Sequence, residues 1–379
     1  MIDDDSGDPH VLATASKIGE VTLVIPGRNC AATLDRCLQS VVPLMQSGEL
    51  KEIIFVDDGS TDTTPEIAAR YPVRVITGGG QGPGAARNLG WRAAQSELIW
   101  FIDSDCVAHP DALQQLLPHL SEPEVAGVGG SYSNLFPESL LATLIHEEIV
   151  ARHRSMLTEV NFLGGFNVIY RRIALEHARG FDERDVNGPR APGAEDCDLS
   201  FRLHQAGHSL RVENSSVVGH HHPRSLRRYI RSQRIHGHWR VRLYRRHLGR
   251  MGGDSYSGPA DHLQPVSGLF AVCGLLFIPF SPIVASAMVS GCVLVNLACT
   301  LVIFRRLQMQ LTSAIHLTSF CALSCVRSVW RGIGIASGML SCLRYPPQSV
   351  EALAQLEEGN ENGIRVFSGA DGNLQEKRT

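Results

Sequence analysis

The chain has 379 residues, 44% of them hydrophobic, and a formal net charge of −3, which is enough material for one large domain and an accessory region. The ten cysteines form no CxxC pair, which argues against a zinc ribbon or a thioredoxin-like site and favours free thiols in a reducing compartment. Residues 1–18 are acidic and polar, without the basic and apolar regions of a signal peptide, and we expect them to form a disordered arm.

The pattern over residues 20–106 predicts strands that alternate with helices. The expected strands are 20–26, 52–56, 73–76 and 98–102, and the expected helices are 29–42, 64–70 and 85–94. A glycine-rich loop, 78–84, precedes the third helix. This order is typical of an α/β domain with a largely parallel sheet, whose ligands bind at the carboxyl ends of the strands.

Acidic residues follow two of these strands. Asp57 and Asp58 come after the second strand, and Asp103 and Asp105 come after the fourth, one residue apart. Two carboxylates this close repel each other unless a cation lies between them, and a hard divalent ion that also binds a diphosphate meets this need. An acidic pair in a solvated surface turn is the alternative.

Five motifs lie within the first 202 residues: VIPGRN at 24–29, VDDGSTD at 56–62, GPGAARNLG at 82–90, FIDSDC at 101–106 and GAEDCDLSFR at 193–202. In this order and spacing they resemble the inverting family 2 glycosyltransferases with the GT-A fold. The resemblance covers about residues 19–225 and implies a Rossmann-like nucleotide-diphospho-sugar transferase domain. It further implies a nucleotide-diphospho-sugar donor, an acceptor hydroxyl, inversion at the sugar, and Mg²⁺ or Mn²⁺ as cofactor.

The resemblance places the donor site at the first four motifs. Asp57 or Asp58 would accept hydrogen bonds from the base or ribose, with capping of the next helix as the alternative. Arg87, at the start of a helix, would bind the nucleotide or a phosphate, with a surface arginine as the alternative. The donor-binding residues expected are Pro26, Arg28, Asp57, Asp58, Gly84, Arg87, Asp103 and Ser104.

The metal would neutralise the departing diphosphate, with Asp105 in direct contact and Asp103 nearer the ribose or assisting through water. Three adjacent histidines, residues 220–222, follow an expected strand at 216–219 and offer a third ligand. Imidazole suits Mn²⁺ better than Mg²⁺. Because three adjacent rings cannot all face one ion, a solvated turn is an equal alternative. The expected metal ligands are Asp103, Asp105 and His220.

The fifth motif would supply the chemistry. The resemblance implies Asp196 as the general base that takes the proton of the attacking hydroxyl, on the side opposite the diphosphate. Glu195 would bind the acceptor hydroxyl or orient the loop. Gly164, Gly165 and Phe166 would leave room for the donor sugar and acceptor, with a plain glycine turn as the alternative.

The hydrophobic signal comes late in the chain. Residues 266–304 hold no charged side chain over 39 positions. Since one span needs about 20 apolar residues, this length predicts two membrane spans closed by a turn at Pro279 and Pro282, with a buried globular hairpin as the alternative. Two arginines interrupt the apolar stretch 311–343, so we expect an interfacial or re-entrant helix there.

Arginines concentrate just before this stretch. Residues 224–250 contain ten arginines and no acidic residue. Such a segment suits anionic membrane lipids and marks the cytosolic side. We therefore expect a cell inner-membrane protein with a cytoplasmic catalytic domain, a glycan or lipid-linked acceptor, and no nucleic-acid partner. Arginines interleaved with aromatic residues leave a nucleic-acid interpretation as the alternative.

Other functions fit the motifs less well. A sugar-phosphate nucleotidyltransferase would carry a Gly-rich, Lys-containing loop after its first strand, which residues 25–34 lack. A silent nucleotide-sugar-binding protein would not need all the acidic residues, and the glycine loop is misplaced for a Rossmann dehydrogenase. Processive members of the family that the chain resembles carry a Gln-x-x-Arg-Trp motif, and its broken spacing at 232–240 implies single sugar transfer rather than polymerisation. The expected organisation is an arm (1–18), a GT-A domain (19–225), a basic juxtamembrane segment (226–262), a transmembrane hairpin with an interfacial helix (263–345), and a polar tail (346–379).

Overall fold

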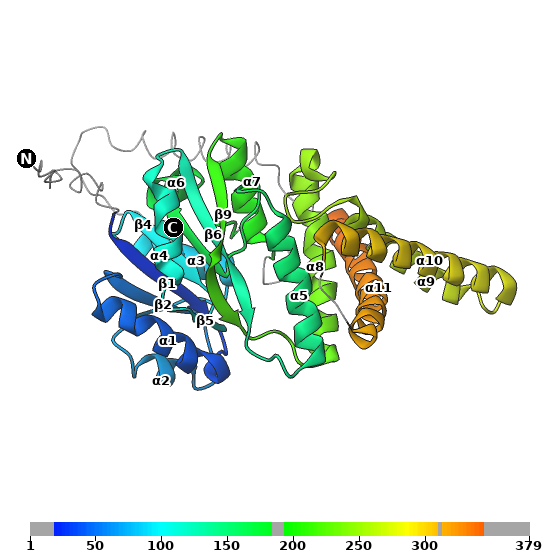
Figure 1. The fold of residues 1–379 in the computed structure, drawn as a ribbon, viewed down its shortest axis with the longest axis horizontal. Helices are drawn as coiled ribbons and strands as arrows, with labels where there is room; N and C mark the ends of the chain where they lie inside the picture. Colours follow the sequence, from blue (N-terminus) through cyan, green and yellow to red (C-terminus); the bar gives the residue numbers. More distant parts are fainter. Residues whose placement is uncertain (1–18, 184–192, 310–312, 345–379) are drawn as a thin grey trace, which may run out of the picture.

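The computed structural model describes residues 19–183, 193–309 and 313–344, so the expected arm and polar tail lie outside the described residues. The first half of the chain alternates strands with helices, as the sequence predicts (Figure 1). The elements are β1 (Val21–Gly27), α1 (Ala31–Gln46), β2 (Glu52–Asp57), α2 (Thr64–Ala68), β3 (Arg74–Thr77), α3 (Pro83–Ala93) and β4 (Leu98–Ile102). β1 pairs in parallel with β2 and β4, and β2 pairs in parallel with β3, which confirms the parallel sheet for this half.

The second half extends this sheet with strands of both directions. Its elements are β5 (Cys106–Ala108), α4 (Ala112–Leu116), a 3₁₀ helix η2 (Leu117–Ser121), β6 (Val125–Asn134), α5 (Leu140–Ser155), β7 (Glu159–Val160), β8 (Asn167–Arg171), α6 (Arg172–His177), α7 (Glu195–Gln205) and β9 (Ser209–His220). The nine-stranded sheet has the order β3-β2-β1-β4-β8-β6-β9-β5, with β7 also on β9. β8 runs antiparallel to both β4 and β6, so the sheet is mixed rather than parallel throughout.

Helices cover both faces of the parallel strands, so successive side chains of each strand are buried on opposite sides. On one face Leu23 and Phe55 pack with Leu38 of α1. On the other face Val24 packs against α3, where Gly90 lies so close that a Cβ atom would collide with the valine. Each fully buried side chain of this size contributes about 1.5–3 kcal/mol, and this core holds the strand ends rigidly in place.

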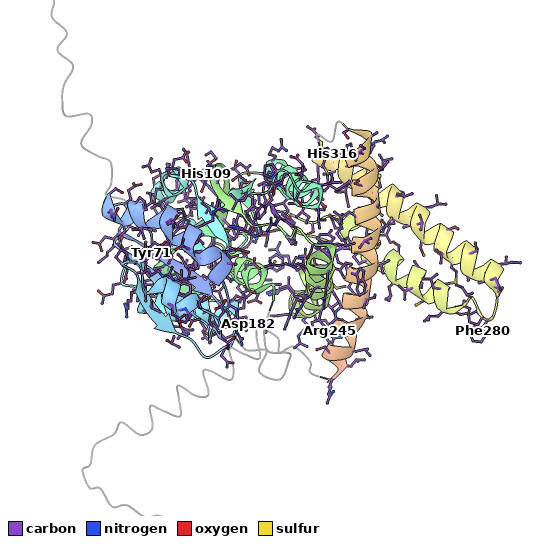
Figure 2. The ribbon with its side chains drawn as sticks, turned by 90° about the horizontal axis from the view of Figure 1, so that it is seen from below. Tyr71, His109, Asp182, Arg245, Phe280 and His316 are labelled. Atoms are coloured by element: carbon purple, nitrogen blue, oxygen red, sulfur yellow. The ribbon has the colours of Figure 1, made fainter. Side chains whose placement is uncertain are left out.

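A helical region follows the sheet domain. It consists of α8 (Leu226–Arg246), a 3₁₀ turn η3 (Leu248–Arg250), α9 (Pro259–Leu276), α10 (Pro282–Leu307) and α11 (Ala314–Arg344). α11 packs along α8, and α9 and α10 form a hairpin that projects away from the body, with Phe280 at its far end (Figures 1 and 2). The α/β domain with a C-terminal helical region is therefore as predicted.

Only one of the two helices expected as membrane spans has the length and composition of a span. Within the described ranges, α10 is the single helix that is long and apolar enough to cross a membrane. α9 starts with the polar sequence PADHLQ, which leaves a shorter apolar portion. The turn therefore divides the uncharged stretch 266–304 unequally between the two helices.

A buried group of charges fastens the helical region to the sheet domain. Arg152 of α5 lies 2.6 Å from Glu148 of the same helix and 2.6 Å from Asp261 of α9. Arg327 of α11 pairs with the same Glu148. Charge at Arg327 therefore lies inside the protein, and removing one member of such a group costs about 3–5 kcal/mol because it leaves the others buried and unpaired.

Candidate active site

The acidic motifs meet at one edge of the sheet because their strands are parallel neighbours. Gly27 at the end of β1 is in register with Asp57 at the end of β2, and Asp103 follows directly after β4. Pro26 is buried in β1, whereas Arg28 is exposed, with its guanidinium against the loop at Gly80. The sequence prediction that these strand ends share one edge is confirmed.

Asp57 and Asp58 differ in the hydrogen bonds that they accept. Asp58 accepts hydrogen bonds from the backbone N–H groups of Gln81 (3.0 Å) and Gly82 (2.8 Å), so both of its oxygens shape the glycine-rich loop. Asp57 accepts from the N–H of Ser60 through one oxygen (3.0 Å). Neither acid is the N-cap of α2, which is Thr63. Asp57 therefore keeps more capacity than Asp58 to accept from a ligand.

Arg87 joins the two halves of the predicted site. Its Nη2 lies 2.6 Å from Oδ1 of Asp103, and its Nη1 lies 2.7 Å from Oε1 of Glu195. The residue is only 4% exposed, so the surface-arginine alternative is wrong. Gly165 allows this approach, because a Cβ atom there would lie 2.9 Å from Nη2. A single guanidinium thus links residues that are 92 positions apart in the sequence.

The acidic motif at 195–196 opens α7, where the unpaired backbone N–H groups and the helix dipole favour negative charge. Asp196 is half-buried, and its two oxygens accept from the N–H groups of Gly165 (3.2 Å) and Cys197 (2.8 Å). Glu195 is buried, and burial raises the pKa of its carboxyl although Arg87 opposes this shift. Asp196 is therefore the carboxylate of the pair that a ligand can reach.

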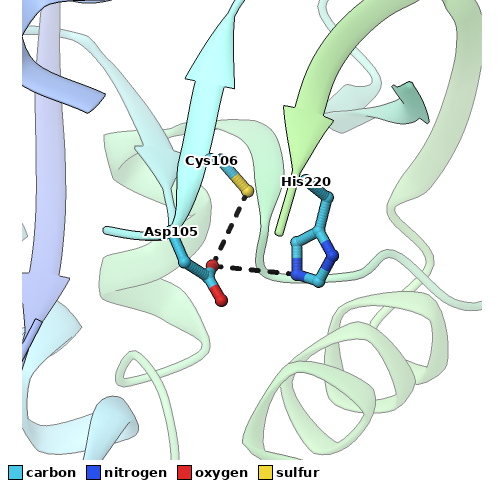
Figure 3. Close-up of side chains that lie close together, drawn as sticks. All are labelled: Asp105, Cys106 and His220. Carbon is cyan, nitrogen blue, oxygen red and sulfur yellow. Dashed lines mark hydrogen bonds and ion pairs between the residues drawn. The ribbon is translucent and has the colours of Figure 1, made fainter. Parts of the chain in front are cut away.

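The expected metal ligands divide into two groups. Oδ1 of Asp105 lies 3.7 Å from Nε2 of His220 and 3.9 Å from Sγ of Cys106, and the three ligand atoms lie within 4.8 Å of one another (Figure 3). Pairing of β5 with β9 places Cys106 opposite His220 and so creates this group. Asp103 instead points its carboxylate at Arg87.

These residues fit a divalent ion. A carboxylate and an imidazole form a mixed oxygen and nitrogen set that Mn²⁺ accepts. Cys106 was not predicted as part of the group, and burial raises the pKa of its thiol well above the ordinary value. Because a thiol binds metals as the thiolate, Asp105 and His220 are the stronger candidates of the three.

The three adjacent histidines have separate environments. Nδ1 of His221 lies 2.8 Å from the backbone oxygen of Asp105. His222 is buried, with its Nδ1 3.1 Å from Nδ1 of His220, and burial lowers the pKa of His222 to about 3. The three rings therefore do not face one point, which agrees with the expectation that three adjacent histidines cannot all bind one ion. His220 is the histidine whose ring lies beside the Asp105 carboxylate.

The other predicted residues lie around this centre. Phe166 is buried and stacks on Tyr132, with 3.6 Å between the ring centroids. Its ring is therefore part of the packing around the site and is not an exposed surface for an acceptor. Gly84 lets α3 approach the backbone at Asp182, because a Cβ atom would lie 2.8 Å from the carbonyl oxygen of that residue, and Glu195 is its next neighbour. Ser104 and Gly164 are half-buried within the same edge.

Trp239 of α8, which lies in the segment with the broken Gln-x-x-Arg-Trp spacing, is a neighbour of the site. Gly193 is the first residue of the motif at 193–202, and a Cβ atom on it would be 2.5 Å from the indole ring. Asp198, one turn into α7, is buried against Arg202 (2.8 Å) and His247 (2.9 Å), which follows α8. The basic segment and the acidic motif therefore form one packed unit.

The comparisons with known proteins agree with this geometry. Residues 22–179 match the domain described as Glycosyl transferase family 2. The pre-mycofactocin glycosyltransferase of Mycobacterium tuberculosis is 30% identical over 260 residues, which cover 64% of this chain and 51% of that protein. The succinoglycan biosynthesis protein ExoO of Rhizobium meliloti is 33% identical over 184 residues, which cover 44% of this chain and 52% of that protein. The chain thus spans about half the length of these relatives.

A solved structure is similar in fold over more of the chain than the family match covers. The mannosyltransferase PcManGT from Pyrobaculum calidifontis, in complex with GDP-Man and Mn²⁺, matches with a TM-score of 0.55 and 16% sequence identity. The match covers 85% of this chain and 88% of that chain. At this identity the likeness concerns the fold, and it supports the expected GT-A-like architecture.

Proposed function

We propose that this protein transfers a single sugar from a nucleotide-diphospho-sugar to an acceptor hydroxyl, with inversion at the sugar and with Mn²⁺ or Mg²⁺. The observation that carries this proposal is the Arg87 bridge, which pairs with both Asp103 and Glu195 and so joins the donor motif to the acidic motif. In the proposal, donor, metal and base would act on one sugar beside this bridge. The match of residues 22–179 to family 2 and the names of the relatives support a glycosyltransferase.

In this mechanism Asp105 and His220 would hold the metal, which supplies positive charge to the departing diphosphate when bound. Asp57 would accept hydrogen bonds from the nucleotide, with Arg28 alongside. Arg87 keeps the Asp103 carboxylate oriented and does not itself take part in bond making. Each of these residues then acts on the donor and none on the acceptor.

Asp196 would act on the acceptor. The acceptor oxygen forms a bond to the anomeric carbon while the bond from that carbon to the diphosphate oxygen breaks, and the bonding electrons leave with the diphosphate. The hydroxyl proton passes to the Asp196 carboxylate. The backbone N–H groups of Gly165 and Cys197 donate to that carboxylate and so hold its orientation.

We further propose that the protein works on the cytoplasmic side of the cell inner membrane, on a glycan or lipid-linked acceptor. α10 is a largely apolar helix of 26 residues that ends in Arg305 and Arg306, and α8 exposes Arg227, Arg228, Arg231 and Arg234. An apolar helix together with a basic helix face suits an anionic lipid surface. Synthesis of a polysaccharide or glycolipid is consistent with the name of the Rhizobium relative.

The test is release of nucleoside diphosphate by the full chain in detergent, from a panel of nucleotide sugars with Mn²⁺ or Mg²⁺. Asp196→Asn is expected to bind donor but lose transfer by at least about 100-fold, because a positioned base contributes that much. Asp105→Ala is expected to lose metal-dependent donor binding. Asp111→Asn, an exposed aspartate before α4, serves as the control and keeps full activity.

Three outcomes would contradict the proposal. Transfer at the native rate by Asp196→Asn would remove the assigned base. Pyrophosphate release from a nucleoside triphosphate and a sugar phosphate would indicate a nucleotidyltransferase. Donor binding without any release by the native protein, across the panel and with membrane lipids present, would indicate a silent binding protein.

A further inference from the structure

The α9–α10 hairpin has a base that is fixed to the protein and a tip that is free of it. Near the base, Nε2 of Gln264 donates to Oγ1 of Thr300 (2.9 Å), and Gly268 packs so closely on α11 that a Cβ atom would collide with the backbone of Ser328. Near the tip, Gly274 contacts only the partner helix, at Met288. Figure 2 shows this outer part extending clear of the body to Phe280.

The part of the hairpin that is free of the protein is shorter than a bilayer core. Its two arms still pack in the protein at Gly268 and at Asn296, which is 3% exposed. Beyond these contacts, residues 268–280 and 283–296 measure roughly 18 Å and 20 Å at about 1.5 Å per residue. A hydrocarbon core is about 30 Å thick. Although α10 as a whole is long enough to cross a membrane, the tip of the hairpin would therefore stop short of the opposite headgroups.

The composition of the turn agrees with this depth. Residues 275–284 read LLFIPFSPIV, and Phe280 and Ile283 are each 83% exposed. A turn that reaches the opposite headgroups normally carries Trp, Tyr, Lys or Arg, which prefer that interface. This turn has none of them, and Ser281 is its only polar residue.

The backbone of the turn is suited to a medium without water. An unpaired N–H group in hydrocarbon costs several kcal/mol, so irregular backbone is normally kept out of it. Here the N–H groups of Phe277, Ile278, Phe280 and Ser281 donate to carbonyls within residues 274–277. The turn also contains two prolines, at 279 and 282, which have no N–H group.

We infer that α9 and α10 form a re-entrant hairpin, which enters the bilayer from the side of the catalytic domain and ends within the hydrocarbon without reaching the opposite face. This inference rests on the membrane location in the proposed function. The tip of the hairpin then contacts lipid acyl chains. The start of α9 and the end of α10 both lie on the side of the membrane that carries the catalytic domain. α11 crosses the base of the hairpin, where its exposed Ile315, Met339 and Leu340 suit the near interface.

Cysteine accessibility tests this arrangement. Phe280→Cys and Leu248→Cys replace exposed apolar residues on the hairpin tip and on the body, 83% and 67% exposed respectively. Each is made in the full chain with the native cysteines kept, and sealed inside-out and right-side-out vesicles of the expressing cells are treated with a membrane-impermeant maleimide, with labelling of the unsubstituted chain subtracted as background. Leu248→Cys is expected to react only in inside-out vesicles. Phe280→Cys is expected to react in neither and to react fully once the membrane is dissolved, because the thiolate does not form in hydrocarbon.

The alternatives give different patterns. Labelling of Phe280→Cys in right-side-out vesicles would mean that the hairpin crosses the membrane, and labelling in inside-out vesicles would mean that it lies outside the bilayer. Nucleoside diphosphate release by the same vesicles reports the proposed function separately. An active enzyme with a reactive tip overturns only the re-entrant hairpin, whereas a protected tip with no release overturns only the transferase.

Discussion

Arg87 lets the geometry of the site be tested through one side chain. It uses separate nitrogens for Asp103 and Glu195, at 2.6 and 2.7 Å. Arg87→Lys keeps the positive charge, but one ammonium cannot replace both nitrogens of the planar guanidinium. Loss of one buried hydrogen bond between charged groups costs about 1.5–3 kcal/mol. Arg87→Ala leaves both carboxylates without their cation and is expected to cost about 3–5 kcal/mol.

Arg87→Lys is also expected to weaken binding of Mn²⁺ with a nucleoside diphosphate. If about 1.4–2.8 kcal/mol of the loss is expressed at the site, affinity falls by about 10-fold to 100-fold, because Asp103 is then no longer held in position beside the donor site. Thermal unfolding in detergent measures the stability, and calorimetric titration of Mn²⁺ with GDP or UDP measures the affinity.

Arg92 provides the matched control for this experiment. It lies one turn further along α3 and pairs with Glu183 at 2.9 Å, but both side chains are well exposed. Arg92→Lys is therefore expected to change the free energy of unfolding by less than about 0.5 kcal/mol and to leave Mn²⁺ affinity unchanged. Equal behaviour of Arg87→Lys and Arg92→Lys in both assays would refute the bridging role.

Two further predictions follow from the metal group and from the buried charges. His220→Ala is expected to weaken Mn²⁺ binding by about 10-fold to 100-fold and Mg²⁺ binding by less, because imidazole prefers Mn²⁺; titration of the two ions compares them, and equal losses would argue against His220 as a ligand. Burial alone would raise the pKa of Glu148, but Arg327 and Arg152 lower it to about 2. The ionised form of Glu148 therefore stabilises the folded state by roughly 3 kcal/mol above pH 4.5. This contribution is lost as the pH falls toward 2. Glu148→Gln is expected to remove that dependence and to cost about 3–5 kcal/mol at pH 7, which unfolding measured across this pH range detects; a variant as stable as the native protein at pH 7 would contradict it.

Several expectations about single residues changed once the neighbours were known. Asp58 was expected at the nucleotide, but its oxygens accept from Gln81 and Gly82 and so hold the loop. Phe166 was expected beside the acceptor, but it is stacked on Tyr132. A residue type and its motif indicate that a position matters, whereas the groups that surround it determine which contact it makes.

The amino-acid sequence by itself determined the strands that end in acids and the location of the apolar hairpin. Short apolar runs, strand-end carboxylates and long uncharged stretches are properties of neighbouring residues, so Asp57, Asp103 and residues 266–304 could be assigned without a fold. It did not determine the antiparallel strands β8 and β5, because strand direction depends on connections between distant segments.

Only the tertiary structure decided how the site is assembled. Pairing of β5 with β9 brings His220 to Asp105, and the close approach at Gly165 brings Arg87 to Asp103 and Glu195. Apart from Arg87 and Asp103, which are 16 positions apart, these contacts join residues more than 100 positions apart, whose meeting depends on the packing of the whole sheet and not on any local pattern. The same holds for the hairpin, since its composition identifies an apolar segment, but its reach depends on where α9 crosses α11.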